Sequence, residues 1–263
     1  MSARRHIAFS CQGHRLAGTL DDAPGQVALL LVTGGNETRA GAFSGQAHLA
    51  ARIAEAGYPV FRYDRRGVGD SEGPNSGFRG SLPDMAAAID ALRQHAPQVR
   101  RIAGFGNCDA AAALMLMQGA GLDGLILSNP WTVEEGDAAP PPRAVRARYA
   151  AKMRNPGEVM RLLTGRVSLK KLAKGIVQAS RPAPAPTTLA AEIAAGLAGF
   201  PGPVSILLAD RDRTAQLFEQ GWSKSDPRVL RCPEASHAFV EPEARIWLSE
   251  QLLAMLRRLE ERL

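Results

Sequence analysis

The chain reads RIAGFGNCDAAAA from residue 101 to residue 113. Residues 101–105 predict a short buried strand, and the Ala, Leu and Met residues after the corner predict a helix with small side chains on its first turn. Between them lies a corner centred on Cys108. A sharp strand-to-helix corner needs small residues two positions before and after its central residue, and Gly106 and Ala110 meet that requirement.

Outward from this corner, buried strands alternate with helices. The apolar run at 27–33 is continuous, as expected of a strand that is covered on both faces in a parallel sheet. Further strands are predicted at 58–63, 122–127, 203–208 and 229–231, and helices at 44–56, 82–95, 110–118 and 242–263. An N-terminal hairpin is predicted over 6–9 and 15–20, with its turn at Gln12 and Gly13. This alternation predicts an α/β fold with a doubly wound, mostly parallel sheet.

The rhythm is interrupted between residues 131 and 199, where no strand is predicted. This stretch contains Ala139-Pro140-Pro141-Pro142, basic helical segments and a second proline-rich run at 181–186. We interpret it as a helical, Pro-rich lid insertion into a core formed by residues 1–130 and 200–263.

The net charge of +6 comes from scattered arginines and lysines rather than from one basic stripe. Nucleic-acid binders more often show such a stripe with interleaved aromatic residues, so nucleic acid is not an expected partner. A basic rim that attracts an anionic substrate or a membrane surface is more plausible.

The three cysteines, Cys11, Cys108 and Cys232, are far apart and odd in number, which disfavours a disulfide framework or a metal cluster. No N-terminal signal-like segment and no run of 18 apolar residues occurs, so we expect a cytoplasmic location and no stable membrane insertion. The oligomeric state stays open.

Cys108 is the candidate nucleophile, because a thiolate at this corner can attack a substrate when a base lies close by. The alternative is that Cys108 is simply a small buried residue at a strand end, which is common for free cysteine.

His237 is the candidate base. It follows the strand near residue 230, so it reaches the same carboxyl edge of the sheet as Cys108, where open α/β sheets bind their ligands. Asp212 is our choice for the acid that orients it, with Asp210 as the alternative; both follow the strand at 203–208. The remaining aspartate, or Thr214, is expected to cap the following helix. The other histidines are assigned to the N-terminal hairpin or to helices: His6, His14, His48 and His95.

An oxyanion formed by this chemistry needs two N–H donors. We expect one from the backbone of Asp109, at the start of its helix, and the other from Gly35 or Asn36, in the loop after the strand at 27–33. The alternative for the Gly34-Gly35 pair is an ordinary strand-to-helix turn.

The loop at 63–73, YDRRGVGDSEG, resembles the D-x-R-G-x-G-x-S-x-G signature of α/β hydrolases. Its Arg65 and Arg66 are expected to pair with nearby carboxylates such as Asp64 or Asp70. The resemblance covers residues 5–130 and 200–260 and implies an α/β-hydrolase fold. The chain departs from the usual pattern by carrying Cys108 in place of Ser, and Ala110 in place of Gly. Dienelactone hydrolases are similar in using a cysteine at this corner.

Four segments more narrowly resemble the first hydrolase family associated with the exosortase A system, which accompanies bacterial exopolysaccharide and protein-sorting loci. These segments are VTGG at 32–35, GNCDA at 106–110, SNPW at 128–131 and DRTA at 212–215.

These motifs predict a hydrolase that cleaves an ester, thioester or lactone of a small-molecule acyl substrate through an acyl-enzyme. The chemistry requires no cofactor and no metal. Two alternatives stay open: an acyltransferase that passes the acyl group to a sugar or an amine, and a non-catalytic binding protein of the same fold. Alkylation of Cys108 measured across pH distinguishes the binding protein from the two enzymes, because an ordinary thiol is alkylated with a midpoint at pH ~8.5.

Overall fold

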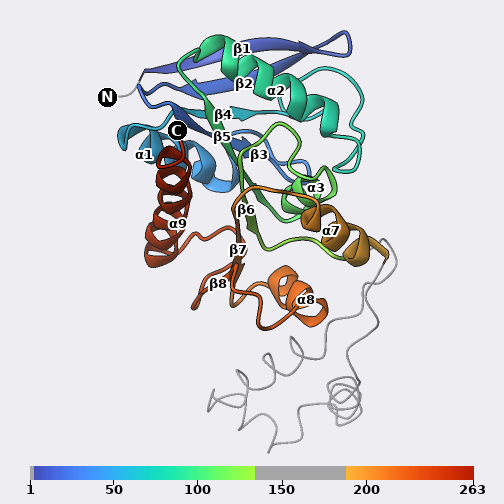
Figure 1. Ribbon diagram of the computed structural model, residues 1–263. Coiled ribbons are helices and arrows are strands. Elements are labelled where there is room, and N and C mark those ends of the chain that lie inside the picture. The colour runs from blue at the N-terminus through green and yellow to red at the C-terminus, as the bar shows by residue number, and fades with distance from the viewer. Residues whose placement is uncertain (1–2, 134–187) are drawn as a thin grey trace, which may run out of the picture.

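The computed structural model describes residues 3–133 and 188–263, and a sheet of eight strands lies at the centre of this part of the chain (Figure 1). The strands are β1 (Arg4–Cys11), β2 (His14–Asp21), β3 (Val27–Val32), β4 (Val60–Tyr63), β5 (Arg101–Asn107), β6 (Gly124–Ser128), β7 (Val204–Ala209) and β8 (Val229–Cys232). Their order across the sheet is β1-β2-β4-β3-β5-β6-β7-β8. From β4 to β8 all neighbours are parallel, while β2 runs antiparallel to β1 and to β4. The predicted α/β fold with a mostly parallel sheet is confirmed.

Strand β3 shows why its sequence is apolar without interruption. Its six residues are all buried, and successive side chains point to opposite faces of the sheet. Val27, Leu29 and Leu31 pack into the core on one face. The alternate residues Ala28, Leu30 and Val32 pack into the core on the other.

Helices cover both faces of the sheet (Figure 1). They are α1 (Gly45–Glu55), preceded by a 3₁₀ turn at Ala42–Ser44, α2 (Leu82–His95), α3 (Asp109–Leu116), α7 (Thr188–Ala198), α8 (Arg213–Gly221) and α9 (Pro242–Glu260). The apolar residues of α1 and α9 share one core. Those of α2, α3, α7 and α8 share the other. The doubly wound arrangement is therefore confirmed.

The predicted elements agree with the structure to within a few residues. The hairpin of β1 and β2 turns at Gln12 and Gly13, which both have positive φ angles, 50° and 81°. Two such residues form the tight turn whose twist matches that of the flanking strands. Strand β5 continues to Asn107, two residues further than predicted, and it delivers the chain directly to Cys108.

The predicted lid, residues 131–199, lies mostly outside the described residues. Its last part, α7, packs Leu189, Ile193 and Leu197 into the same core as α3. The division into a core and a lid stays a prediction.

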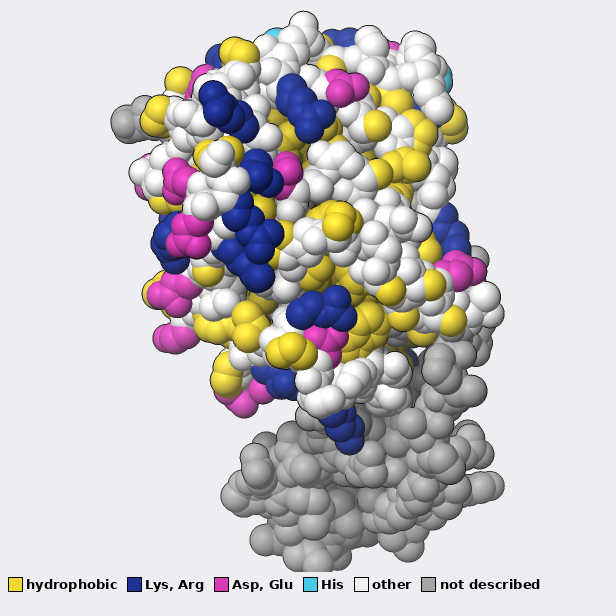
Figure 2. All heavy atoms as spheres, in the orientation of Figure 1, with side chains coloured by type: hydrophobic (Ala, Val, Ile, Leu, Met, Phe, Trp, Pro, Cys, Tyr) yellow, Lys and Arg dark blue, Asp and Glu magenta, His cyan; other side chains and the backbone are white. Residues whose placement is uncertain are grey.

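Several charged side chains are buried in ion pairs beneath the surface. Arg66 pairs with Asp84 rather than with the neighbouring acids expected from the sequence, and Arg62 pairs with Asp21. On the face drawn in Figure 2, basic and acidic side chains lie intermixed between apolar patches. No helix in the described part of the chain has both the length and the apolar character needed to cross a bilayer.

Candidate active site

Cys108 occupies a strained corner between β5 and α3. Its φ of 63° and ψ of −124° lie in a region that L-residues rarely adopt. The backbone N–H of Cys108 donates to the carbonyl of Ser128, at 2.9 Å, which fixes the corner to the end of β6. Such strain is characteristic of a residue that presents its side chain at the top of the sheet.

The corner tolerates no side chain at Gly106. A Cβ there would lie 2.7 Å from the carbonyl carbon of Ala110 and 2.9 Å from its oxygen. The backbone of Ala110 therefore fills the space that a side chain on residue 106 would need, and Ala110 itself is buried.

His237 lies between β8 and α9, and its Nδ1 is 3.0 Å from Oδ2 of Asp212. Asp212 is buried, and the same oxygen accepts the N–H of Ala215, at 3.1 Å. This carboxylate therefore both pairs with the histidine and caps α8. The expectation that the other aspartate or Thr214 would serve as the cap is wrong. Asp210 is exposed, and its backbone N–H donates to Cys232.

The surroundings of His237 stabilise its protonated form. Hydrogen bonds with Asp212 and with Cys108 raise the pKa of His237 from 6.5 to about 10, against the opposing effect of partial burial. His237 therefore has a buried carboxylate on its Nδ1 and Cys108 as a further hydrogen-bonding neighbour.

The loop after β3 lies directly against the corner. The N–H of Gly35 donates to both carboxylate oxygens of Asp109, at 2.7 and 2.9 Å. A Cβ on Gly34 would displace the Asp109 carboxylate and would lie 2.9 Å from the backbone oxygen of Asn107, so glycine suits this close approach. The side-chain oxygen of Asn36, Oδ1, accepts a hydrogen bond of 2.8 Å from the side-chain amide of Asn75.

The Gly35 N–H expected to bind an oxyanion is thus occupied by a carboxylate in this conformation. The N–H of Asp109 belongs to the first turn of α3, where a helix offers no internal acceptor. Three predicted donors, Gly35, Asn36 and Asp109, therefore lie together, and one of them is engaged.

Arg65 supports the same loop. Its Nη2 donates to the carbonyl of Gly35, and it does not pair with Asp64 or Asp70 as expected. Both of those carboxylates pair with Arg39 instead. The signature loop therefore contacts the backbone of the candidate oxyanion site.

A cleft of about 890 Å³ opens over the corner. Cys108, Asp109, His237, Gly35 and Asn36 all line it. Its apolar lining residues are Phe78, Trp131, Val133 and Leu189, together with Ala42 and Ala238. Apart from Asp212, which is buried behind His237, every predicted site residue faces this cleft.

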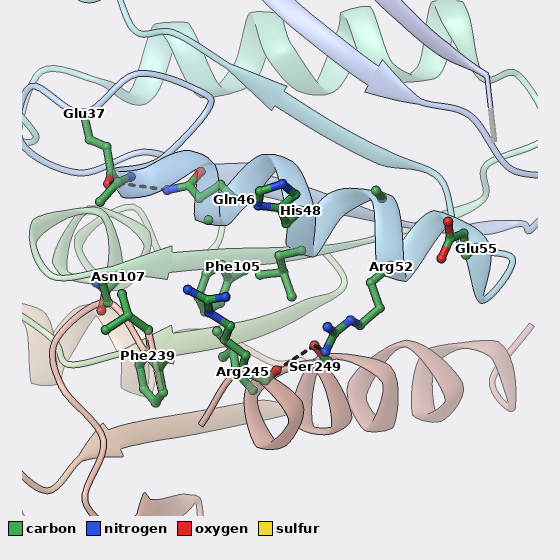
Figure 3. A pocket seen from close by; sticks show the side chains of 17 residues that line it. Glu37, Gln46, His48, Arg52, Glu55, Phe105, Asn107, Phe239, Arg245 and Ser249 are labelled. Atoms are coloured by element: carbon green, nitrogen blue, oxygen red, sulfur yellow. Dashed lines mark hydrogen bonds between the residues drawn. The ribbon is translucent and has the colours of Figure 1, made fainter. Parts of the chain in front are cut away.

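A second cavity, of about 490 Å³, lies between α1 and α9 (Figure 3). It has basic residues on its walls, Arg52 and Arg245. It shares four lining residues with the first cleft: Glu37, Ala42, Asn107 and Ala238. Neither Cys108 nor His237 lines it, so the chemistry belongs to the first cleft. Within the described residues, no group of three or more His, Cys, Asp or Glu side chains is placed to hold a metal ion.

Sequence reasoning missed two supporting amides, Asn107 and Asn129. Their side chains donate to the carbonyl of His237, at 3.1 and 3.2 Å. The available signal was a polar residue directly after a buried strand, within the SNPW segment at 128–131.

The model of the alpha/beta hydrolase family matches residues 29–247. No curated protein matches the chain.

Solved structures of low sequence identity share the fold. The esterase Pf2001 of Pyrococcus furiosus aligns with a TM-score of 0.64 at 15% identity, covering 98% of this chain and 91% of the other. The alpha/beta hydrolase GrgF of Penicillium sp. sh18 aligns with a TM-score of 0.63 at 16% identity, covering 97% and 98%. A dienelactone hydrolase of Anabaena variabilis aligns with a TM-score of 0.60 at 13% identity, covering 98% of each chain.

Proposed function

Because this chain belongs to the alpha/beta hydrolase family, we propose that it hydrolyses an ester, thioester or lactone through a triad of Cys108, His237 and Asp212. The observation that carries the proposal is the hydrogen-bonded series at the cleft. Cys108 lies at the strained corner and bonds with His237, which in turn lies 3.0 Å from Asp212.

In the first half of the reaction, His237 already carries the thiol proton, because its bonds with Asp212 and Cys108 keep the imidazole protonated, and the two residues react as an ion pair. The thiolate attacks the carbonyl carbon, a C–S bond forms, and the carbonyl electron pair moves to oxygen. The N–H of Asp109 and that of Gly35 or Asn36 bind this oxyanion. When the intermediate collapses, the bond to the leaving group breaks, and His237 returns its proton to the departing alcohol or thiol.

In the second half, His237 takes a proton from water, and the hydroxide attacks the acyl carbon. The C–S bond then breaks, the acid is released, and the sulfur leaves as a thiolate that pairs again with the protonated His237. Throughout, Asp212 holds the imidazole in one tautomer and stabilises its charged form.

A cysteine suits activated acyl groups better than amides. Its thiolate leaves a tetrahedral intermediate more readily than an amine does, so an amide substrate returns to the starting state. The apolar side chains of Phe78, Trp131 and Leu189 along the cleft suit the apolar part of an acyl substrate. One structural neighbour is itself named a dienelactone hydrolase, which supports an activated ester or lactone.

The test is an activity screen over short and long acyl esters and thioesters with Cys108→Ala and Cys108→Ser beside the wild type. We expect Cys108→Ala to abolish turnover and to prevent the acyl adduct seen by intact mass spectrometry. Cys11→Ala is the matched control, because Cys11 is buried in the hairpin and bonds to Asp84. Full activity in Cys108→Ala would contradict the mechanism.

The same assay separates the two other functions. An acyltransferase forms the adduct but gives mainly the transferred product when a sugar or amine acceptor is added. A binding protein forms no adduct with any substrate, and its Cys108 is alkylated with the midpoint of an ordinary thiol, ~8.5.

The proposal also includes the narrower family. Three of its four segments meet at the cleft: Gly34 and Gly35 come from the first, Cys108 and Asp109 from the second, and Trp131 from the third. These contacts support a member of the exosortase A-associated hydrolases, and we also propose that residues 131–199 form its lid. The free cysteines are consistent with a reducing, cytoplasmic location.

A further inference from the structure

Asn129 is a fully buried amide at the end of β6. None of its surface is exposed, and its φ is 43°, a left-handed conformation that Asn adopts more readily than most residues. A buried amide is costly unless its donors and acceptor are all satisfied. Its hydrogen bonds therefore show which parts of the fold depend on it.

The amide joins three separate segments. Its Oδ1 accepts the N–H of Ala209, at 2.9 Å, at the end of β7. Its Nδ2 donates to Oδ1 of Asn107, at 3.0 Å, and to the carbonyl of His237, at 3.2 Å. Ala209 stands three residues before Asp212, and Asn107 directly precedes Cys108. One side chain thus contacts each segment that carries a member of the proposed triad.

The carbonyl of His237 accepts a second hydrogen bond, from the side chain of Asn107. Nδ2 of Asn107 donates to it at 3.1 Å, so two amides hold one carbonyl. Figure 3 shows Asn107 beside the segment that carries Phe239. Phe239 is buried and stacks on Trp247 with ring centroids 6.1 Å apart. This stacking anchors the segment between β8 and α9 on the C-terminal side of His237.

His237 depends on these anchors because packing confines its side chain only in part. About 42% of the His237 side chain is exposed. Its position relative to the sulfur is consequently set by its bond to Asp212 and by the backbone that the two amides hold. Losing either hydrogen bond leaves a buried polar group without its partner, which disfavours the present conformation of this backbone.

We infer that Asn129 is a positioning residue, which sets the distance between the imidazole of His237 and the sulfur of Cys108 by fixing the histidine backbone to the ends of β5, β6 and β7. The inference rests on the proposed triad. It assigns to Asn129 a role in turnover that does not require contact with substrate.

The test uses Asn129→Gly, which keeps the positive φ and removes the amide, and Asn129→Asp, which keeps the acceptor for Ala209 and removes the donors. We expect kcat to fall by about 10- to 100-fold, because displacing a catalytic group by about 1 Å can slow the reaction by a factor of that size. KM should change by less than about threefold. We also expect the pH midpoint of Cys108 alkylation to differ from that of the wild type, because the reactivity of a cysteine depends on the cationic groups that lie beside its sulfur. Asn129→Gly leaves the identity of the titratable groups that line the cleft unchanged, Glu37, Arg79, Asp109 and His237, whereas Asn129→Asp adds a carboxyl group, so the pH midpoint is read from the Gly variant.

Two further variants separate positioning from stability. Asn107→Ala removes the second donor to His237 and should shift the alkylation midpoint in the same direction, which tests the inference even if the Asn129 variants do not fold. Tyr58→Phe removes a hydrogen bond of 2.8 Å from the Tyr58 hydroxyl to Glu260, and neither residue lines the cleft. This variant should lower the melting temperature without moving the alkylation midpoint of Cys108.

The inference is overturned if the Asn129 and Asn107 variants lower the melting temperature and leave both kcat and the alkylation midpoint at wild-type values. That outcome differs from failure of the proposed function, in which the wild type itself shows an ordinary thiol midpoint or Cys108→Ala stays active.

Discussion

The carboxylate of Asp109 accepts the backbone N–H of Gly35 through both of its oxygens, at 2.7 and 2.9 Å. This places a negative charge one residue from the proposed nucleophile, on a donor that an oxyanion would use. A substrate oxygen reaches the Gly35 N–H only after the carboxylate leaves it. Binding to the N–H of Asn36 does not require the carboxylate to move. Removing the carboxylate therefore tests which of the two N–H groups binds the oxyanion.

We expect Asp109→Ala to raise kcat/KM for a neutral ester by about tenfold, if Gly35 is the donor. A hydrogen bond to a charged group is worth about 1.5–3 kcal/mol, and 1.4 kcal/mol corresponds to a factor of ten. The variant should also lose about 0.3–1 kcal/mol of stability, since Asp109 is the acidic residue of the first turn of α3.

The matched control for that substitution is Asp123→Ala. Asp123 also accepts a backbone N–H, that of Ile102 at 2.8 Å, but it does not line the cleft. Its kcat/KM should stay at the wild-type value. An unchanged kcat/KM in Asp109→Ala would assign the oxyanion donor to Asn36 instead of Gly35.

Asp212→Asn should lower kcat by about 10² to 10⁴, because an amide at this position favours the wrong tautomer of His237. The cap of α8 should be kept, since Asn caps a helix as well as Asp does, so the loss of stability should be limited to about 1 kcal/mol from the pairing with His237. Asp210→Asn should stay within about twofold of the wild type, by steady-state kinetics on the same ester. The reverse result would exchange the roles of the two aspartates.

The raised pKa of His237 predicts how stability depends on pH. The folded chain holds this proton up to about pH 10, whereas the free side chain loses it near 6.5. Its contribution to folding is fully present below the lower value and is lost as the pH rises toward the higher one. Because 42% of the side chain is exposed, we expect a contribution on the order of 1 kcal/mol after allowing for solvent screening.

The measurement is urea unfolding of the wild type and of His237→Gln across that pH range. The difference between their free energies of unfolding should shrink as the pH rises. If the difference were constant with pH, the bonds to Asp212 and Cys108 would not be holding the proton.

Gly106→Ala should destabilise the chain by about 1–3 kcal/mol and lower activity, because the new Cβ lies 2.7 Å from the Ala110 backbone. Gly45→Ala is the matched control. Gly45 has helical angles, φ −59° and ψ −44°, and a Cβ there meets nothing within 4 Å. Thermal melting should separate the two variants. Equal melting temperatures would mean that the corner relaxes to admit a methyl group.

Much of the fold was predictable because its signals are local. The uninterrupted apolar run of β3 indicated a strand buried on both faces, and Gly106 with Ala110 indicated the sharp corner at Cys108. The positions of the strand ends followed, and with them the edge of the sheet that carries His237.

The pairing of side chains at that edge was not predictable. The sequence left Asp210 and Asp212 as alternatives, since both follow β7, and the structure brings Asp212 to His237. It gave no sign that Arg65 would bind the carbonyl of Gly35 instead of an acid beside it.

The sequence by itself determined which residues reach the carboxyl edge of the sheet, because burial and turn geometry depend on neighbours a few positions away. Only the tertiary structure decided which of them touch. Asn129 binds Ala209 and His237, which lie 80 and 108 residues further along the chain. Such contacts depend on the relative heights at which β5, β6 and β7 end. That stagger arises when the strands pair, and no local pattern records it.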